Sequence, residues 1–278
     1  MYTNNKSLAD AADKKKVLVA AHRGTCGGNV ICNTTLAYQN ALLHGADMIE
    51  IDVSMTADGI FYAFHNTEEK VVFGKECDIR QMWSQEVEEI NLLNSIQNTS
   101  GQRVERLADL LPRFKGKCLI NIDRSWFYWE KVISFLKSMD MEDQILLKCG
   151  VEDIYLQQLA DSKAGIMYMP IVRTVEEWEQ VKRYDLNVAA AELIFTDVKE
   201  PLADQNFLEE LRSQGILPWV NAITLNDQCV LSGGLDDNGA IGEGFDKHWG
   251  TLMDMGFQII QTDWPGLLKN YVKQKYHL

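Results

Sequence analysis

The chain has 278 residues, of which 46% are hydrophobic and 9% aromatic, so it can bury the core of one large domain or of two ordinary ones. Its formal net charge of −13 argues against nucleic acid and anionic membranes as partners, because both bind through basic patches and the longest basic run is Lys14–Lys16. An anionic substrate would therefore need cations placed within its own site.

The N-terminal segment and the cysteines bear on where the protein works. Residues 1–16 are polar and no apolar run is long enough to cross a membrane, so we expect no stable membrane insertion. The chain as written fits the cytoplasm, and an exported protein whose signal peptide had been removed would begin similarly. The cysteines show neither a CxxC pair nor zinc-site spacing, and we expect buried free thiols. They are Cys26, Cys32, Cys77, Cys118, Cys149 and Cys229.

Eight short apolar runs are predicted to be strands, with amphipathic, helix-like segments between them. The predicted strands are residues 17–24, 48–55, 118–125, 144–150, 165–172, 189–195, 216–224 and 257–265. Eight strand–helix units in about 250 residues are the pattern of a (β/α)₈ TIM barrel, an α/β fold, which we expect to form a single domain over residues 1–278. A doubly wound sheet is the alternative, but the run GTCGG lacks the G-x-G-x-x-G spacing of its phosphate loop.

Two segments interrupt this alternation. Residues 56–117 hold a hairpin-like piece, DGIFYAFH, and then a mixed segment, so we expect a small insertion after the second strand, at approximately residues 66–103. Residues 226–244 are rich in Gly, Asp and Asn and are predicted to form a loop over the mouth of the barrel. Both segments follow the carboxyl ends of strands, where barrels carry their active sites.

The predicted strand at 48–55 contains two carboxylates. Glu50 and Asp52 are two residues apart, so their side chains point to the same face. Asp123 lies near the end of the next predicted barrel strand, and three carboxylates that face one cavity repel each other unless protons or a cation compensate. A hard divalent cation with oxygen ligands, Ca²⁺ or Mg²⁺, accounts for the set most simply. We therefore predict that these three residues hold a metal ion.

Two histidines and several further side chains complete the predicted site. Displacement at a phosphodiester needs a base and an acid, and imidazole titrates near neutral pH, so His22 and His65 are the expected pair. Arginine can offer a planar fork to phosphate oxygens, and lysine a point charge. The residues expected to contact the substrate are Arg23, Lys148, Glu192, Trp219 and Asn221.

AHRG at residues 21–24, followed by NTTLAYQNALLHGADMIEIDVSMTADGIFYAFHN, resembles the signature of the glycerophosphodiester phosphodiesterase family. The ordered match spans residues 21–66, and weaker matches continue through LINID and the closing TDWP. The resemblance implies a (β/α)₈ barrel that hydrolyses glycerophosphodiesters to glycerol 3-phosphate and an alcohol. By position, it implies that Glu50, Asp52 and Asp123 are metal ligands. It also implies that His22 and His65 act as acid and base, and that Arg23 contacts phosphate.

Four positions depart from the family pattern. Cys32 stands where the family usually has Glu before Asn-Thr, and Asn66 stands where it has Asp after His. The Glu-x-Lys of the third strand becomes Asp-Arg-Ser at residues 123–125, which keeps a carboxylate on a shorter side chain and loses a lysine. We expect Lys148 on the next strand to restore that positive charge, with its ammonium close to Asp123 and the phosphate.

The predicted function is a metal-dependent phosphodiesterase that acts on a small-molecule phosphodiester. One alternative is a lysophospholipase-D-like enzyme, in which a hydroxyl of the substrate attacks phosphorus and leaves a cyclic phosphate. Its long-chain substrate would need an apolar groove, for which the insertion offers Trp83, Leu92, Leu93 and Ile96. Another alternative is a non-catalytic barrel that binds a phosphate ligand, although the presence of both histidines argues against it. The alcohol moiety, the metal and the oligomeric state stay open.

Overall fold

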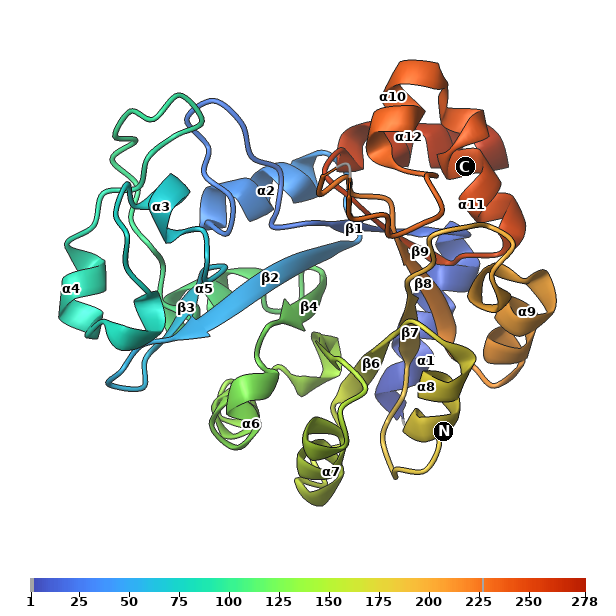
Figure 1. Cartoon of the computed structure of the whole chain (residues 1–278), viewed down its shortest axis with the longest axis horizontal. Coiled ribbons are helices and arrows are strands. Elements are labelled where there is room, and N and C mark those ends of the chain that lie inside the picture. The colour runs from blue at the N-terminus through green and yellow to red at the C-terminus, as the bar shows by residue number, and fades with distance from the viewer. Residues whose placement is uncertain (1–2, 227) are drawn as a thin grey trace.

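Parallel strands form a closed barrel that helices surround in the computed structural model, which describes residues 3–226 and 228–278 (Figure 1). The barrel strands are β1 (Leu18–Ala21), β2 (Met48–Met55), β4 (Leu119–Asp123), β5 (Ile145–Cys149), β6 (Met167–Val172), β7 (Ala190–Leu193), β8 (Leu217–Asn221) and β9 (Ile259–Thr262). Strand β1 pairs with β2 on one side and with β9 on the other, which closes the sheet. The predicted (β/α)₈ TIM barrel is therefore confirmed, and each predicted strand forms.

Side chains of β2 alternate between the two faces of the barrel wall. Ile49 and Ile51 pack in the core between strands and helices, whereas Met48 belongs to a second cluster inside the barrel. Because successive residues of a strand point to opposite faces, Glu50 and Asp52 share the face of Met48 and point inward. Ile49, Ile51 and Val53, which contribute to the apolar pattern that predicts this strand, therefore lie on its outer face.

Helices follow the strands around the outside of the barrel. They are α2 (Thr35–Leu43), α5 (Leu107–Leu110), α6 (Trp129–Ser138), α7 (Asp153–Asp161), α8 (Val175–Val181), α9 (Gln205–Ser213), α10 (Asp237–Glu243), α11 (Trp249–Met255) and α12 (Pro265–Tyr276). Thr34 caps α2, because its side chain accepts a hydrogen bond from the Ala37 backbone N–H. Among the described residues, none of the helices combines the length and the apolar character needed to cross a bilayer.

Helix α1 (Thr3–Lys15) covers the N-terminal end of the barrel. Leu8 packs with the apolar cluster inside the barrel. Asp47, just before β2, anchors this end, because its carboxylate lies 2.7 Å from the ammonium groups of both Lys15 and Lys269 and accepts a hydrogen bond from the Val19 backbone. This helix and its ion pairs close the N-terminal end, whereas Asp52 and Asp123 of the predicted site lie towards the opposite end, where the strands finish.

An insertion follows β2 through a short hairpin. Strand β3 (Phe61–Ala63) runs antiparallel to β2, as the hairpin-like sequence predicts, and helices α3 (Glu69–Val72) and α4 (Ser84–Glu88) come next. In Figure 1 these elements lie to the left of the barrel. A small apolar cluster joins these elements to the loop after β1, and it is formed by Ile31, Tyr62, Phe64, Phe73, Ile79, Val87, Ile90, Leu92 and Val104.

Two expectations from the sequence need correction. Residues 226–244, predicted as a loop, include helix α10, and Asp236 caps it by accepting a hydrogen bond from the Gly239 backbone; Asp227 lies outside the described residues. The cysteines are not all buried free thiols, because a disulfide joins Cys26 to Cys32 in the loop after β1. Of the other four, Cys149 alone is buried. Sequence spacing excludes common metal motifs but does not show which loop brings two cysteines together.

Candidate active site

Three carboxylates meet at the carboxyl ends of β2 and β4. Oxygen atoms of Glu50, Asp52 and Asp123 lie within 4.8 Å of one another. Strand register produces this cluster, since Asp52 and Asp123 are direct partners in the parallel pairing of β2 with β4. The structure thus brings together the three predicted metal ligands, and their role as ligands stays a prediction.

Glu50 carries the clearest sign that the cluster suits a cation. Its side chain is buried, and Oε2 accepts a hydrogen bond of 2.9 Å from the Arg23 backbone N–H. The buried Oε1 has no hydrogen-bond partner among the residues that the structure describes. Burial raises the pKa of Glu50 well above its usual value, and the negative charges of Asp52 and Asp123 raise it further. An all-oxygen set with an unpaired buried oxygen fits a hard divalent cation.

Asp52 is ionised more easily than Glu50, although both are buried. Burial alone would raise the pKa of Asp52, but neighbouring groups outweigh burial and lower it. These groups are Arg23, His65, His22 and Asn33. Asn33 donates a hydrogen bond of 2.9 Å to Asp52 Oδ2 and accepts one from the Tyr38 hydroxyl, so the Asn-Thr motif after β1 orients this carboxylate.

Arg23 is surrounded by acidic groups rather than open to solvent. Its Nε lies 2.9 Å from Asp52 Oδ2 in an ion pair without a directed hydrogen bond, and its Nη1 donates to Glu68 at 3.3 Å. The backbone at Arg23 has a φ of 54°, a left-handed conformation uncommon for a side chain of this size. The predicted phosphate contact of Arg23 is not tested by this arrangement.

His22 has a carboxylate partner that the sequence analysis did not select. Its Nδ1 lies 2.8 Å from Oδ1 of Asp263, the residue directly after β9. Asp263 is itself fixed, because its backbone N–H donates to the buried carboxylate of Asp237 in α10. The available signal was the closing TDWP motif, which places an acidic residue at the end of the last strand.

His65 has a different environment. Its Nδ1 lies 3.5 Å from the Thr67 hydroxyl, and it lines a small cavity together with Arg23. Burial lowers the pKa of His65; the charge of Asp52 acts in the opposite direction, and Arg23 lowers the pKa further. Asn66, at the position of the family's Asp, is buried and accepts a hydrogen bond of 2.9 Å from Arg124 Nε.

Lys148 lies where the sequence analysis expected it, next to Asp123. Its Nζ is 2.8 Å from Asp123 Oδ2 and 3.1 Å from Glu192 Oε2, and only 4% of the side chain is exposed. Burial alone would lower the pKa of Lys148, but the charges of Asp123, Glu192 and Glu50 outweigh burial and raise it. The ammonium therefore stays charged and neutralises two carboxylates inside the barrel; its contact with phosphate stays a prediction.

The other predicted substrate contacts extend this network deeper into the barrel. Asn221 donates to Glu192 Oε1 at 2.9 Å and accepts a hydrogen bond of 2.7 Å from Trp219 Nε1. Trp219 has no exposed surface and packs in the cluster inside the barrel. Trp219 and Asn221 are two residues apart and share the inward face of β8, with the Trp219 ring buried in the apolar cluster, so the structure gives no support to a substrate contact of Trp219, which stays a prediction. Ser125, in the family's lysine position, is also fully buried, and within the described part of the chain its Oγ has no hydrogen-bond partner.

The apolar groove expected for a long-chain substrate is not formed by the four insertion residues. Leu92 belongs to the core of the insertion, whereas Trp83 and Ile96 are exposed by 61% and 73%. Leu93 is half-buried. The four therefore divide between core packing and open surface, and this weakens the argument for a lysophospholipid substrate.

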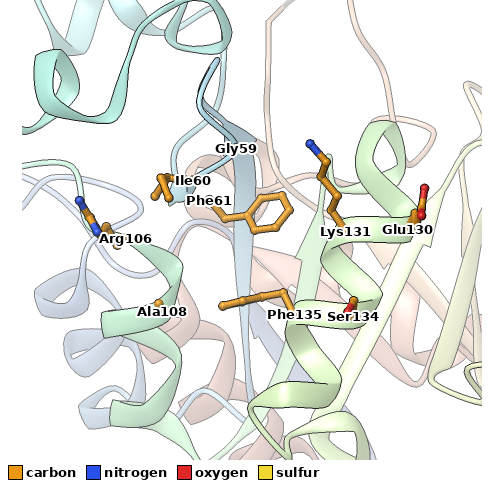
Figure 2. A pocket seen from close by; sticks show the side chains of 9 residues that line it. All are labelled: Gly59, Ile60, Phe61, Arg106, Ala108, Glu130, Lys131, Ser134 and Phe135. Atoms are coloured by element: carbon orange, nitrogen blue, oxygen red, sulfur yellow. The ribbon is translucent and has the colours of Figure 1, made fainter.

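A separate hollow of about 530 Å³ lies on the outer surface between β3, α5 and α6. Figure 2 shows the rings of Phe61 and Phe135 within it and the Lys131 side chain near its rim. Arg106, which also lines it, is paired with Glu88. None of the predicted catalytic or metal-binding residues lines this hollow, so the chemistry is not expected there.

Comparison with known proteins gives results that agree with the fold and the motif. Residues 168–272 match the family DUF4996, described as a domain of unknown function. A curated glycerophosphodiester phosphodiesterase of Caldanaerobacter subterraneus subsp. tengcongensis is 26% identical over 182 residues, which cover 61% of this chain and 73% of that protein.

Two solved structures illustrate the likeness in fold. A glycerophosphoryl diester phosphodiesterase from Parabacteroides distasonis superposes with a TM-score of 0.76 at 15% identity, covering 94% of this chain and 87% of its own. A phosphodiesterase from Oleispira antarctica, solved in complex with the product sn-glycerol-3-phosphate, gives a TM-score of 0.66 at 16% identity, covering 94% and 99%. The ordered motif and the curated relatives, together with a barrel of the same fold, support a relationship to the glycerophosphodiester phosphodiesterase family.

Proposed function

We propose that this protein is a metal-dependent phosphodiesterase that hydrolyses glycerophosphodiesters to glycerol 3-phosphate and an alcohol. The observation that carries the proposal is the cluster of Glu50, Asp52 and Asp123, whose oxygens lie within 4.8 Å of one another. Both histidines lie near this cluster, since His22 and His65 each help to lower the pKa of Asp52. The similarity to curated glycerophosphodiester phosphodiesterases and the product complex of the Oleispira antarctica neighbour support the same reaction class.

The cluster is the proposed metal site. Glu50, Asp52 and Asp123 would hold Ca²⁺ or Mg²⁺, which supplies positive charge to the phosphate oxygens and favours negative charge that develops in the transition state. The unpaired buried Oε1 of Glu50 supports this assignment, because a buried carboxylate oxygen without a partner is costly unless a ligand satisfies it.

The two histidines are the proposed acid and base. Asp263 accepts a hydrogen bond from Nδ1–H of His22, which leaves Nε2 of His22 to exchange a proton with the substrate. The lowered pKa of His65, caused by its burial with a further contribution from Arg23, favours a neutral imidazole that can accept a proton. Water then attacks phosphorus with help from one histidine, and the leaving alkoxide takes a proton from the other.

A product assay tests this proposal. Purified protein is incubated with glycerophosphocholine, glycerophosphoethanolamine, glycerophosphoinositol or lysophosphatidylcholine, with Ca²⁺, Mg²⁺ or chelator, and the products are followed by phosphorus NMR. The proposal expects glycerol 3-phosphate from a glycerophosphodiester and no product with chelator. A cyclic phosphate would favour the lysophospholipase-D-like alternative, and no turnover across the panel would favour a non-catalytic binding protein.

A further inference from the structure

Both cations expected to bind phosphate are already paired with carboxylates. Arg23 contacts Asp52 and Glu68, and Lys148 contacts Asp123 and Glu192. A phosphodiester anion that enters a site rich in carboxylates needs positive charge that is not already neutralised. Arg124, the residue directly after β4, carries such a charge.

Arg124 directly follows Asp123, where the backbone turns with a φ of 56°. Its Nε donates a hydrogen bond of 2.9 Å to Oδ1 of Asn66. Within residues 3–226 and 228–278, none of the ion pairs includes Arg124. Because Asn66 is neutral and buried, it fixes the guanidinium without cancelling its charge.

Arg124 also lies beside the catalytic machinery. Asn66 is the neighbour of His65 in the sequence. Burial has the largest effect on the pKa of His65, followed by Asp52 and Arg23, and the positive charge of Arg124 also lowers this pKa. Two departures from the family pattern thus meet in one contact: Asn66 replaces an aspartate, and the segment of Arg124 lacks the lysine. An aspartate at position 66 would pair with Arg124 and neutralise it.

We propose that Arg124, positioned by Asn66, binds the phosphate of the substrate in place of the lysine that this chain lacks. The inference rests on the proposed function, because it assigns a role within that site. The Nε–Asn66 hydrogen bond leaves the two terminal amino groups of the guanidinium to contact non-bridging phosphate oxygens. Asn66 acts through Arg124 and is therefore a positioning residue.

Binding of a phosphate probe tests the inference without requiring turnover. Calorimetry measures the Kd of glycerol 3-phosphate and of inorganic phosphate for the metal-loaded protein and for Arg124→Gln and Arg124→Lys. Loss of a charged hydrogen bond is expected to raise both Kd values by about tenfold or more in Arg124→Gln, and less in Arg124→Lys. The matched control is Arg113→Gln, at an exposed arginine in the turn before β4, which should leave both Kd values unchanged.

A double-mutant cycle tests the role of Asn66. Asn66→Asp should weaken phosphate binding several-fold in the wild-type background, because the new carboxylate pairs with Arg124. In the Arg124→Gln background the same change should weaken binding less. Equal effects in both backgrounds would overturn the positioning role, since a general effect of the added charge does not depend on Arg124.

Kinetics separate this inference from the proposed function. With glycerophosphocholine or another accepted diester, Arg124→Gln should lower kcat/KM by about 10²-fold at an unchanged Tm. If Arg124→Gln unfolds the protein, the Kd values of Arg124→Lys and Asn66→Asp for phosphate test the inference instead. A folded Arg124→Gln variant with wild-type Kd values would overturn this inference and leave the proposed function intact. Wild-type protein that hydrolyses no diester would overturn the proposed function, and the Kd comparison would then still test whether Arg124 binds phosphate.

Discussion

Oδ1 of Asp263 lies 2.8 Å from Nδ1 of His22, although the two residues are 241 positions apart in the sequence. Closure of the barrel explains the contact, because β1 and β9 are neighbouring strands and both residues directly follow their strand ends. A carboxylate at Nδ1 fixes the ring orientation and the tautomer of an imidazole that exchanges protons through Nε2. The site therefore includes a histidine–carboxylate pair formed by the first and the last strand.

Removal of the Asp263 carboxylate should impair catalysis more than binding. Asp263→Ala is expected to lower kcat by about 10²-fold or more with little change in KM, because His22 loses its orientation and its preferred tautomer. Nitrogen NMR of His22 should show the proton shifting away from Nδ1. The control Asp161→Ala removes an exposed carboxylate at the end of α7 and should leave kcat unchanged. An Asp263→Ala enzyme with normal kcat would exclude this positioning role.

Lys148 should contribute strongly to stability. Lys148→Met leaves the buried Glu192 and the partly buried Asp123 without the ammonium that compensates their charges, so we expect a loss of about 3–5 kcal/mol in the free energy of unfolding, measured with urea. Adding Glu192→Gln should recover part of that loss, because one unpaired carboxylate is removed. Lys137→Met, at an exposed position of α6, serves as the control. A neutral Lys148→Met variant would contradict the ion-pair network described for the barrel interior.

Asp237 should make stability depend on pH. Burial raises the pKa of Asp237 to about 7, even though Trp249, Thr262 and the Asp263 backbone donate hydrogen bonds to it. The folded protein then keeps this proton to a higher pH than the unfolded chain, so its stabilising effect is complete below about pH 4 and is lost as pH rises through about 7.

The comparison of Asp237→Asn with wild-type protein isolates this effect. The free energy of unfolding of the wild type, relative to the variant, should fall by up to about 4 kcal/mol between pH 4 and pH 8. Asp185→Asn changes an exposed carboxylate and should follow the wild type across that range. Parallel curves for wild type and Asp237→Asn would show that Asp237 is ionised throughout.

The barrel and the acidic cluster could be predicted because they depend on local patterns. Alternation along β2 places Glu50 and Asp52 on one face, and the order of strands places Asp123 beside them. Lys148 could be placed near Asp123 for the same reason, since β4 and β5 are adjacent.

The remaining features depend on contacts that sequence spacing does not encode. The sequence analysis gave no reason to pair His22 with Asp263, or to join Cys26 to Cys32, because loop conformation decides both. Trp219 shares the inward face of β8 with Asn221, and the sequence does not show that its ring is buried in the apolar cluster inside the barrel. Helix α10 was not predicted, because its segment has the composition of a loop, with an Asp cap and glycines that are also typical of turns.

The central claim is that phosphodiester hydrolysis takes place at the carboxylate cluster and requires a metal ion there. The most direct measurement is the rate of glycerol 3-phosphate release from glycerophosphodiesters by chelator-treated wild type and Glu50→Gln, before and after addition of Ca²⁺ or Mg²⁺. We predict no release without metal, restored release when metal is returned to wild type, and at least about 10²-fold less in Glu50→Gln at every metal concentration. Undiminished release in excess chelator, or a Glu50→Gln variant as active as wild type, would contradict the claim.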